Sequence, residues 1–546
     1  MVNLVGHPLL GKGAAANLLL MAATPPIRGR FRRDRRARAA YAEAAGIYRI
    51  VPSAVCLPAD VADVVALVRW AAETGVPLVP RGAGSAMPGN NVGNGVVVDL
   101  TALEGPPPVV DAGARRARMT AGTSLGALEQ AAAHARLRLP PDPSSWRWAT
   151  AGGVVSTNAA GGRSVRYGPV RPWVEAVEMV TGTGEVVSLR RGQSAPLRPR
   201  PLPSVPPLPA WPRVRKNSFG YAVDAYARSG NPLDLVIGSE GTLGIITAVE
   251  WRLDPIPPAR GGLRVLLDSY RALPELVADL IGLEVSALEL LDRTFLDVVR
   301  SAQPQVPLPN AEAVLLIEVE AADEAALRSA VEAVVRVARP RALGVDAGLS
   351  TAGADRIWQL RHAASPILAG LPPERRSLQV IEDGCVPLAR LGDYVAAIRD
   401  AAERAGIPVV LFGHAGDANL HVNALPDVTR RGWRTRLAAL YDEVSSAVVR
   451  LGGIPSGEHG AGRLRAGLLE KVYGSEVMAY FHEVKRHFDP LGIFNPGVIL
   501  PSGEPPLQKL KVGAGAARLP KDIEAGLREI ERTGGYATPR LRLADG

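Results

Sequence analysis

The chain has 546 residues, and one hydrophobic core rarely serves more than about 250–300 residues, so we expect at least two domains. With 47% hydrophobic and 21% charged residues, the composition is that of a folded globular protein and excludes wholesale disorder. The net charge of +9 comes mostly from dispersed arginines, and we therefore expect no nucleic-acid partner.

Cysteine content and apolar runs limit the class of protein further. Cys56 and Cys385 are too few for a disulfide framework or for a cysteine-ligated iron–sulfur cluster. The apolar stretch at residues 18–23 is too short to span a bilayer, and no basic segment precedes it as in a signal peptide. We therefore expect a cytoplasmic protein, with membrane contact only peripheral and through a partner.

The first segment, residues 1–44, is basic, with seven arginines between Arg28 and Arg38. Such a charge run is typical of a solvated arm, and the alternative is a docking patch for an acidic partner or a membrane surface. Residues 45–255 follow as a glycine-punctuated α+β region. Apolar residues at helical spacing predict a helix over 59–74 with Asp60 at its cap, and strands are predicted at 76–80, 96–100, 177–180 and 244–249.

Prolines mark two breaks in this order. Residues 191–212 are too rich in proline for a helix or a central strand, so we predict an extended surface insertion. Residues 254–258 predict a linker to a second α/β or α+β domain, residues 256–500. There we expect strands at 314–319, 378–386 and 409–412 and helices at 324–337 and 391–405. The tail, residues 501–546, shows one short amphipathic segment at 523–530.

Three glycine-rich segments stand out in the first domain, at residues 80–85, 150–162 and 238–247. Their small residues allow backbone N–H groups to approach a phosphate closely. The first segment, PRGAGS, departs from the G-x-G-x-x-G pattern, which disfavours a Rossmann dinucleotide site.

The second domain carries GHAGDANLHVN at residues 413–423 and SGEHGAGR at residues 456–463. Two imidazoles and a carboxylate suit a divalent metal such as Zn²⁺, with a coordination position left for substrate. Mn²⁺ and Fe²⁺ remain alternatives.

Together these segments resemble the FAD-linked oxidases of the vanillyl-alcohol-oxidase type over residues 48–500. Among them the D-2-hydroxyglutarate, D-lactate and glycolate dehydrogenases are most similar, down to a stretch such as DPLGIFNPG at 489–497. The resemblance implies an α+β protein with a PCMH-type FAD-binding domain at 45–255. It also implies an FAD-linked oxidase C-terminal (cap) domain at 256–500, in which helices cover an antiparallel sheet.

The resemblance also assigns the site. The residues implied to bind FAD are Arg81, Gly82, Ala83, Gly84, Ser85, Gly89, Asp142, Thr150, Gly152, Gly153, Ser156, Thr157, Asn158, Gly162, Glu240, Gly241, Ile246 and Asn495. The implied metal ligands are His414, His421 and Glu458, and the implied catalytic residues are His459 as base, Arg361 as carboxylate clamp, Asn423 and Ser365.

Three departures from the family pattern sharpen these expectations. Ser85 stands where relatives with covalent FAD often have His, so we expect non-covalent FAD. Ala418 replaces a usual Gly, which requires a negative φ at that residue. Residues 381–387 lack the Lys of the 2-hydroxyglutarate enzymes, which argues against a long dicarboxylate substrate.

The sequence therefore predicts oxidation of a small D-2-hydroxy acid to the 2-keto acid. Electrons would pass to an external acceptor, either a separate iron–sulfur protein or a quinone-linked carrier, and a homo-oligomer is left open. Two alternatives stand: an alkyl-transferring flavoenzyme of the alkyl-dihydroxyacetone-phosphate synthase type, or a non-catalytic FAD subunit of an electron-transfer complex.

Overall fold

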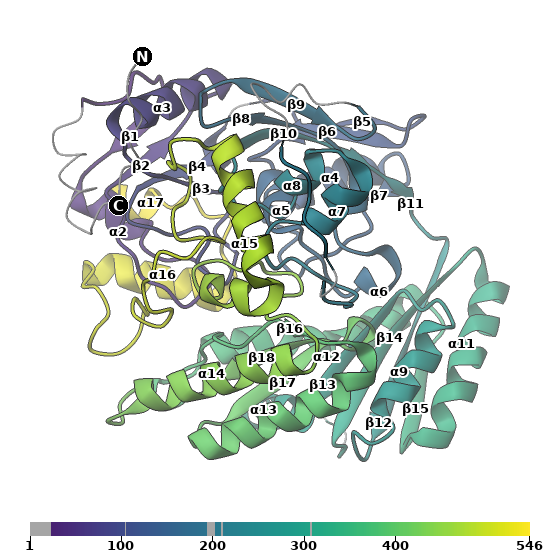
Figure 1. Cartoon of the computed structure of the whole chain (residues 1–546). Helices are drawn as coiled ribbons and strands as arrows, with labels where there is room; N and C mark the ends of the chain where they lie inside the picture. The colour runs from purple at the N-terminus through teal and green to yellow at the C-terminus, as the bar shows by residue number, and fades with distance from the viewer. Residues whose placement is uncertain (1–22, 104, 194–201, 209–210, 306–307, 309) are drawn as a thin grey trace.

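The computed structural model describes residues 23–103, 105–193, 202–208, 211–305, 308 and 310–546, except for the side chains of residues 362–365. Its elements form two bodies (Figure 1). The upper body contains a four-stranded and a five-stranded sheet, and the lower body contains a seven-stranded sheet with its covering helices.

The four-stranded sheet has the order β1-β2-β4-β3, with strands Arg30–Arg32, Ala54–Leu57, Val96–Asp99 and Leu78–Arg81. Helix α3 (Val61–Thr74) covers one face, where Val64 and Val68 pack with Val96. The Asp60 side chain accepts the N–H of Asp63 and so caps α3, as predicted.

The other face of this sheet is covered by both ends of the chain. Val97 on β4 packs with α2 (Arg35–Ala40), α16 (Lys521–Thr533) and α17 (Arg542–Asp545). Figure 1 shows α16 and α17, drawn in yellow, beside the purple α2. The tail is therefore a structural layer of the first domain.

The expectation that the basic segment is a solvated arm is wrong for its described part, whereas the docking-patch alternative stays a prediction. Residues 30–32 form the edge strand β1 on β2. Arg30 and Arg32 each contact Asp545 at 2.8 Å, and Arg36 contacts Asp522 at 2.5 Å. The acidic groups that the arginines meet belong to the tail of the same chain.

The five-stranded sheet is antiparallel, in the order β5-β6-β10-β8-β9. Its strands are Val109–Asp111, Arg116–Thr120, Ile245–Arg252, Val174–Val180 and Val186–Arg190. Helices α4 (Leu125–Ala133) and α5 (Ala151–Thr157) pack against it, and the short helices α6 (Ser164–Tyr167), α7 (Val223–Ser229) and α8 (Leu233–Val236) complete this body.

The predicted linker at residues 254–258 begins with the short strand β11 (Asp254–Pro255), which pairs with β7 (Leu137–Arg138). The proline-rich insertion lies partly outside the described residues. Its described residues, 191–193, 202–208 and 211–212, form neither helix nor strand.

The seven-stranded sheet is antiparallel throughout, in the order β15-β12-β14-β13-β17-β18-β16. Its strands are Gly344–Gly348, Ala259–Leu267, Ala313–Ala321, Ala287–Asp292, Val409–His414, Asn419–Ala424 and Gly384–Cys385. Helices α10 (Arg293–Ala302) and α12 (Thr351–Ala369) cover one face. Helices α9 (Leu273–Ile281), α11 (Glu324–Ala338), α13 (Leu391–Ala405) and α14 (Trp433–Arg450) cover the other. The predicted α+β class and the helix-covered antiparallel sheet are confirmed.

The strand predicted at residues 378–386 is wrong. Only Gly384 and Cys385 form a strand, and Leu378 makes an isolated bridge to Ala424. Between them the chain turns, because Glu382 and Asp383 point their carboxylates at the 456–465 loop. The buried apolar side chains of this stretch imitate a strand pattern.

After the seven-stranded sheet and its covering helices, the chain returns to the upper body. Tyr221 and Phe481 of α15 (Leu469–Phe488) have ring centroids 5.2 Å apart, and Phe494 forms a parallel bridge with Leu78. The unit expected at 256–500 therefore contributes its last thirty or so residues to the first domain (roughly 469–500). Among the described residues, no helix combines the length and apolarity that crossing a membrane requires.

Candidate active site

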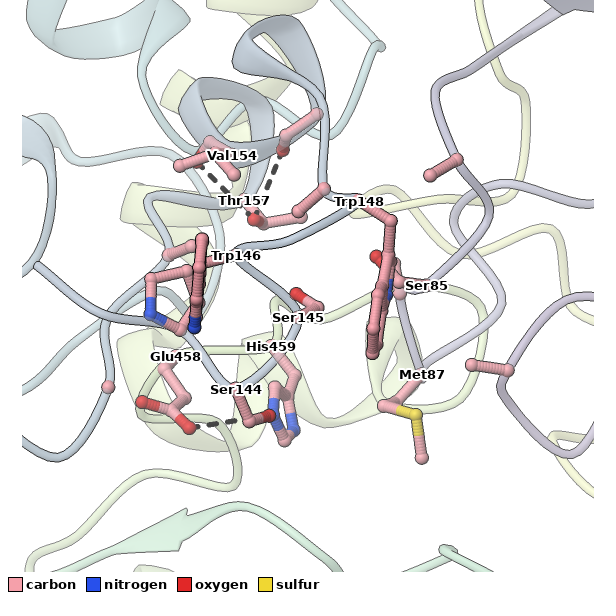
Figure 2. A pocket seen from close by; sticks show the side chains of 18 of the residues that line it. Ser85, Met87, Ser144, Ser145, Trp146, Trp148, Val154, Thr157, Glu458 and His459 are labelled. Carbon is pink, nitrogen blue, oxygen red and sulfur yellow. Dashed lines mark hydrogen bonds and ion pairs between the residues drawn. The ribbon is translucent and has the colours of Figure 1, made fainter. Parts of the chain in front are cut away.

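A cavity of about 890 Å³ lies between the two bodies. Figure 2 looks into it, with the indoles of Trp146 and Trp148 on either side of the view. Most of the residues predicted to bind FAD line it: Arg81, Gly82, Ala83, Gly84, Ser85, Asp142, Thr150, Gly152, Gly153, Ser156, Thr157, Gly162, Glu240, Gly241 and Ile246.

Gly89, Asn158 and Asn495 are not among the residues that line the cavity, so their part in binding FAD stays a prediction. A Cβ on Gly89, where φ is +81°, would lie 2.4 Å from the Tyr48 ring. Asn158 ends α5 with a positive φ. Asn495 donates to the carbonyl oxygens of Asn90 and Glu240 at 2.6 and 2.9 Å. All three hold loops in place behind the cavity wall.

The cavity wall has the character of a ligand site. A Cβ on Gly82 would lie 2.1 Å from Thr150 Oγ1, so only glycine lets the two segments approach this closely. Several buried polar atoms of the lining lack a protein partner among the described residues: Asn90 Oδ1, Asn91 Oδ1, Arg138 Nε, Trp148 Nε1 and Trp358 Nε1. Buried polar groups are rarely left unpaired, so a polar ligand fits here.

Three predicted metal ligands converge on one side of the cavity. His414 ends β17 and His421 lies on the adjacent β18, and their Nε2 atoms are 3.2 Å apart. Glu458 Oε1 lies 3.1 Å from the first and 3.3 Å from the second. The donor set, two imidazoles and a carboxylate, suits a zinc-like divalent ion.

Neighbouring groups orient both imidazoles. His421 Nδ1 donates to the carbonyl oxygen of Glu382 at 2.9 Å, and His414 Nδ1 donates to the Glu289 carboxylate. Each Nε2 is thereby left to face the ligand cluster, as in metal sites whose histidines are held by an outer hydrogen bond. A second possible triad, Glu382, His421 and His459, shares His421. The carboxylate of Glu382 already contacts His459 and Arg465.

Glu289 on β13 connects the candidate metal ligands to the predicted substrate clamp. Its other carboxylate oxygen accepts Arg361 Nε at 2.8 Å. Burial alone would raise the pKa of Glu289, but His414 and Arg361 hold it at about 2. The guanidinium of Arg361 lies over the Phe412 ring, 4.8 Å from its centroid. Its two terminal nitrogens have no hydrogen-bond or ion-pair partner within the described part of the chain, and the residue lines the cavity.

Lys216, which sequence reasoning missed, reaches the cluster from the first domain. Its Nζ lies 2.8 Å from Glu458 Oε2 and 3.5 Å from Asp417 Oδ2, and the side chain is 1% exposed. Burial lowers the pKa of Lys216, but these two carboxylates outweigh that effect and raise it. The lysine therefore stays charged and holds the Glu458 oxygen that points away from the histidines.

His459, the expected base, has its Nδ1 2.5 Å from Glu382 Oε2 and its Nε2 3.5 Å from Glu458 Oε1. Burial lowers the pKa of His459, but Glu382 and Asp383 outweigh that effect and raise it to about 10. These two carboxylates therefore favour the charged form of the imidazole when no metal ion is bound.

The loop that carries Glu458 and His459 is fixed by Asp383, whose side chain is fully buried. Asp383 accepts the backbone N–H groups of Glu458 and His459 at 3.1 and 2.8 Å and the Ser456 hydroxyl at 2.5 Å. Between the two histidines, Ala418 has a φ of +51°, which corrects the expected negative value. Such a conformation costs a non-glycine residue about 1–2 kcal/mol.

Asn423 lines the cavity and accepts the Ser377 hydroxyl at 3.3 Å. Ser365 belongs to α12, and its side chain lies outside the described residues. The sequence did carry a signal for the acidic residues that were missed. Glu318 and Glu320 alternate at the end of an otherwise apolar strand, β14, and Glu289 interrupts β13. A buried charge in a strand usually has a partner or a function.

Comparisons with known proteins identify both domains. A model described as an FAD binding domain matches residues 52–190, and one described as the C-terminal domain of FAD linked oxidases matches residues 259–499. Glycolate oxidase subunit GlcD of Bacillus subtilis (strain 168) is 30% identical over 456 residues, covering 82% of this chain and 89% of the relative. D-lactate dehydrogenase of Archaeoglobus fulgidus is 29% identical, covering 82% and 91%. D-2-hydroxyglutarate dehydrogenase of Xanthomonas citri pv. viticola is 30% identical, covering 83% and 90%.

Solved structures share the fold. The 4-ethylphenol oxidase from Gulosibacter chungangensis superposes with a TM-score of 0.63 at 16% identity, covering 90% of this chain and 97% of the other. An alkyldihydroxyacetonephosphate synthase superposes with a TM-score of 0.57 at 17% identity, covering 90% and 86%. At these identities the likeness concerns the fold alone.

Asp383→Ala is expected to loosen the 456–459 loop. The change leaves two backbone N–H groups and a hydroxyl without their acceptor, and each unsatisfied buried group costs about 1–3 kcal/mol. We expect urea unfolding to show a loss of about 3 kcal/mol or more. Asp427→Ala is the matched control, because Asp427 also accepts a loop N–H but at the surface. Equal stability of the two variants would contradict the anchoring role.

Proposed function

This chain belongs to the family of FAD-linked oxidases, and on that basis we propose that it oxidises a small D-2-hydroxy acid to the 2-keto acid with FAD as cofactor. One arrangement supports the proposal most. The cluster of His414, His421 and Glu458 opens into the same cavity that the glycine-rich segments line. Two relatives at 30% identity, a glycolate oxidase subunit and a D-2-hydroxyglutarate dehydrogenase, point to the same substrate class.

We propose that Arg361 binds the substrate carboxylate. Glu289 holds its Nε, so the two terminal nitrogens are left for a paired, charge-assisted contact with a carboxylate. Asn423 lies on the same cavity wall and would contact the substrate through its amide.

The proposed ligands His414, His421 and Glu458 would hold one divalent ion, zinc in our proposal. Such an ion lowers the pKa of a hydroxyl group bound to it. His459 would accept the hydroxyl proton at Nε2, since Glu382 fixes its Nδ1. The base role requires neutral His459, so the charge of the ion must offset the carboxylates that raise its pKa.

FAD supplies the acceptor for the hydride that leaves the substrate carbon. We propose that it is bound without a covalent bond, because Ser85 offers no imidazole at the cavity wall. We also propose an external electron acceptor, since the only two cysteines are far apart in sequence and both are buried.

The substrate class is tested by anaerobic mixing of the purified protein with the D and L enantiomers of lactate and 2-hydroxyglutarate, and with achiral glycolate. We expect bleaching of the oxidised flavin absorbance with a small D-2-hydroxy acid and not with its L enantiomer. Absence of bleaching with every acid would reject the proposal and favour an alkyl-transferring or non-catalytic flavoprotein.

His459→Ala is expected to slow flavin reduction by about 10²–10⁴-fold, the usual contribution of a positioned base.

Arg361→Ala is expected to raise KM strongly, because it removes carboxylate binding. Stopped-flow reduction at several substrate concentrations separates the two effects. His134→Ala, a surface change outside the cavity, is the control. Wild-type rates in both site variants would place the chemistry elsewhere.

Metal removal is expected to abolish turnover while FAD stays bound.

Glu289→Gln weakens the outer hydrogen bond to His414 and should lower metal affinity by about 10–100-fold. Glu318→Gln is the matched control, since Glu318 is also a buried acid facing an arginine but contacts none of the ligands. Competition with a chromogenic chelator measures both affinities. Full activity in metal-free protein, or equal affinities for the two variants, would reject the assignment.

A further inference from the structure

The family models end at residue 499, but the chain beyond that point also lines the cavity. The lining residues from this tail are Glu531, Arg532, Thr533, Gly534 and Tyr536. They belong to the end of α16 and to the loop that follows it. Nothing in the motifs of the two family domains accounts for their presence there.

The tail is held rigidly in this position. Ile523 and Leu527 of α16 are buried against the four-stranded sheet, so the helix is part of the core of the first domain. Glu531 lies 2.9 Å from Lys511 Nζ and 3.1 Å from Arg376 Nη2, which ties α16 to the second domain. Because α16 contacts both bodies, the loop after it is held in one position at the cavity wall.

The loop packs on an aromatic ring of the cavity. Tyr536 and Trp148 have ring centroids 6.1 Å apart with an interplanar angle of 34°. Gly534 has a φ of +68°, and a Cβ there would lie 3.3 Å from the Trp148 ring. Figure 2 shows the Trp148 indole next to Ser85, on the side of the cavity opposite Trp146. The buried Trp148 Nε1 has no partner among the described residues.

We propose that residues 531–536 are part of the cofactor-binding site and close the FAD cavity on the side of Trp148. The ring of Tyr536 supports the indole that forms the wall, and Thr533 lies at the exposed rim of the cavity. Arg532 also lines the cavity, with its guanidinium paired to the Glu529 carboxylate at 2.7 Å. The proposal rests on the cavity taking FAD and is independent of which acid is oxidised.

Thiol labelling tests the position of the loop. Cys56 and Cys385 are fully buried, so a cysteine placed in the tail is the only accessible thiol among the described residues. Thr533→Cys is compared with Ala537→Cys, an exposed position in the same loop that does not line the cavity. Each full-length variant is deflavinated and treated with a bulky maleimide, with and without FAD.

FAD at about 100 times its Kd is expected to slow labelling at position 533 by up to about 100-fold. At position 537 the rate should not change. Equal labelling rates with and without FAD at both positions would overturn the proposal. Protection at position 533 combined with no flavin bleaching by any hydroxy acid would reject the proposed reaction alone.

A second measurement tests the ring contact. Tyr536→Ser should raise the Kd for FAD by about three- to tenfold, because it removes an aromatic pair from the wall. Tyr536→Phe, which keeps the ring, and Arg542→Ala, on the exposed surface of α17, should leave the Kd unchanged. Flavin fluorescence during reconstitution of apoprotein gives each Kd. A folded Tyr536→Ser variant with the wild-type Kd would overturn the role of Tyr536.

Discussion

The site depends on carboxylates that are buried where the two bodies meet. Removing a carboxylate from water costs several kcal/mol, so it is tolerated only where charged partners and N–H groups surround it. Glu240, from the first body, accepts the backbone N–H groups of Ala461 and Gly462 at 2.8 and 2.9 Å. Glu318, from the second, accepts Arg163 of the first at 2.7 Å. These acids fix how the bodies sit on each other.

The need to pair these buried carboxylates also fixes loops that would otherwise be free to move. The segment after residue 455 has no regular structure around Glu458 and His459, yet Asp383 and Glu382 hold it by backbone and side-chain hydrogen bonds. Lys216 crosses from the first body to hold the far oxygen of Glu458. A site built on loops gains precision when outer residues lock its side chains, and here those residues come from both bodies.

The chain ends contribute to the site as well. The N-terminal strand β1 forms the edge of the four-stranded sheet, which carries the first glycine-rich loop. Helices α2, α16 and α17 cover one face of that sheet. Arginines of the N-terminal segment pair with aspartates of the tail, so part of the charge of the basic segment is neutralised within the molecule. The cavity is thereby lined in part by residues outside the two family domains.

The sequence alone determined the α+β class, the order of most elements and the set formed by His414, His421, Glu458 and His459, because periodicity and short motifs are local. It failed at residues 378–386, where the buried apolar side chains that suggest a strand belong to a turn set by Glu382. Lys216 and Tyr536 could not be found from local pattern, since each acts on residues more than 200 positions away in the chain. The raised pKa of His459 was likewise decided only in the folded protein, because it arises when two distant carboxylates are buried beside the ring.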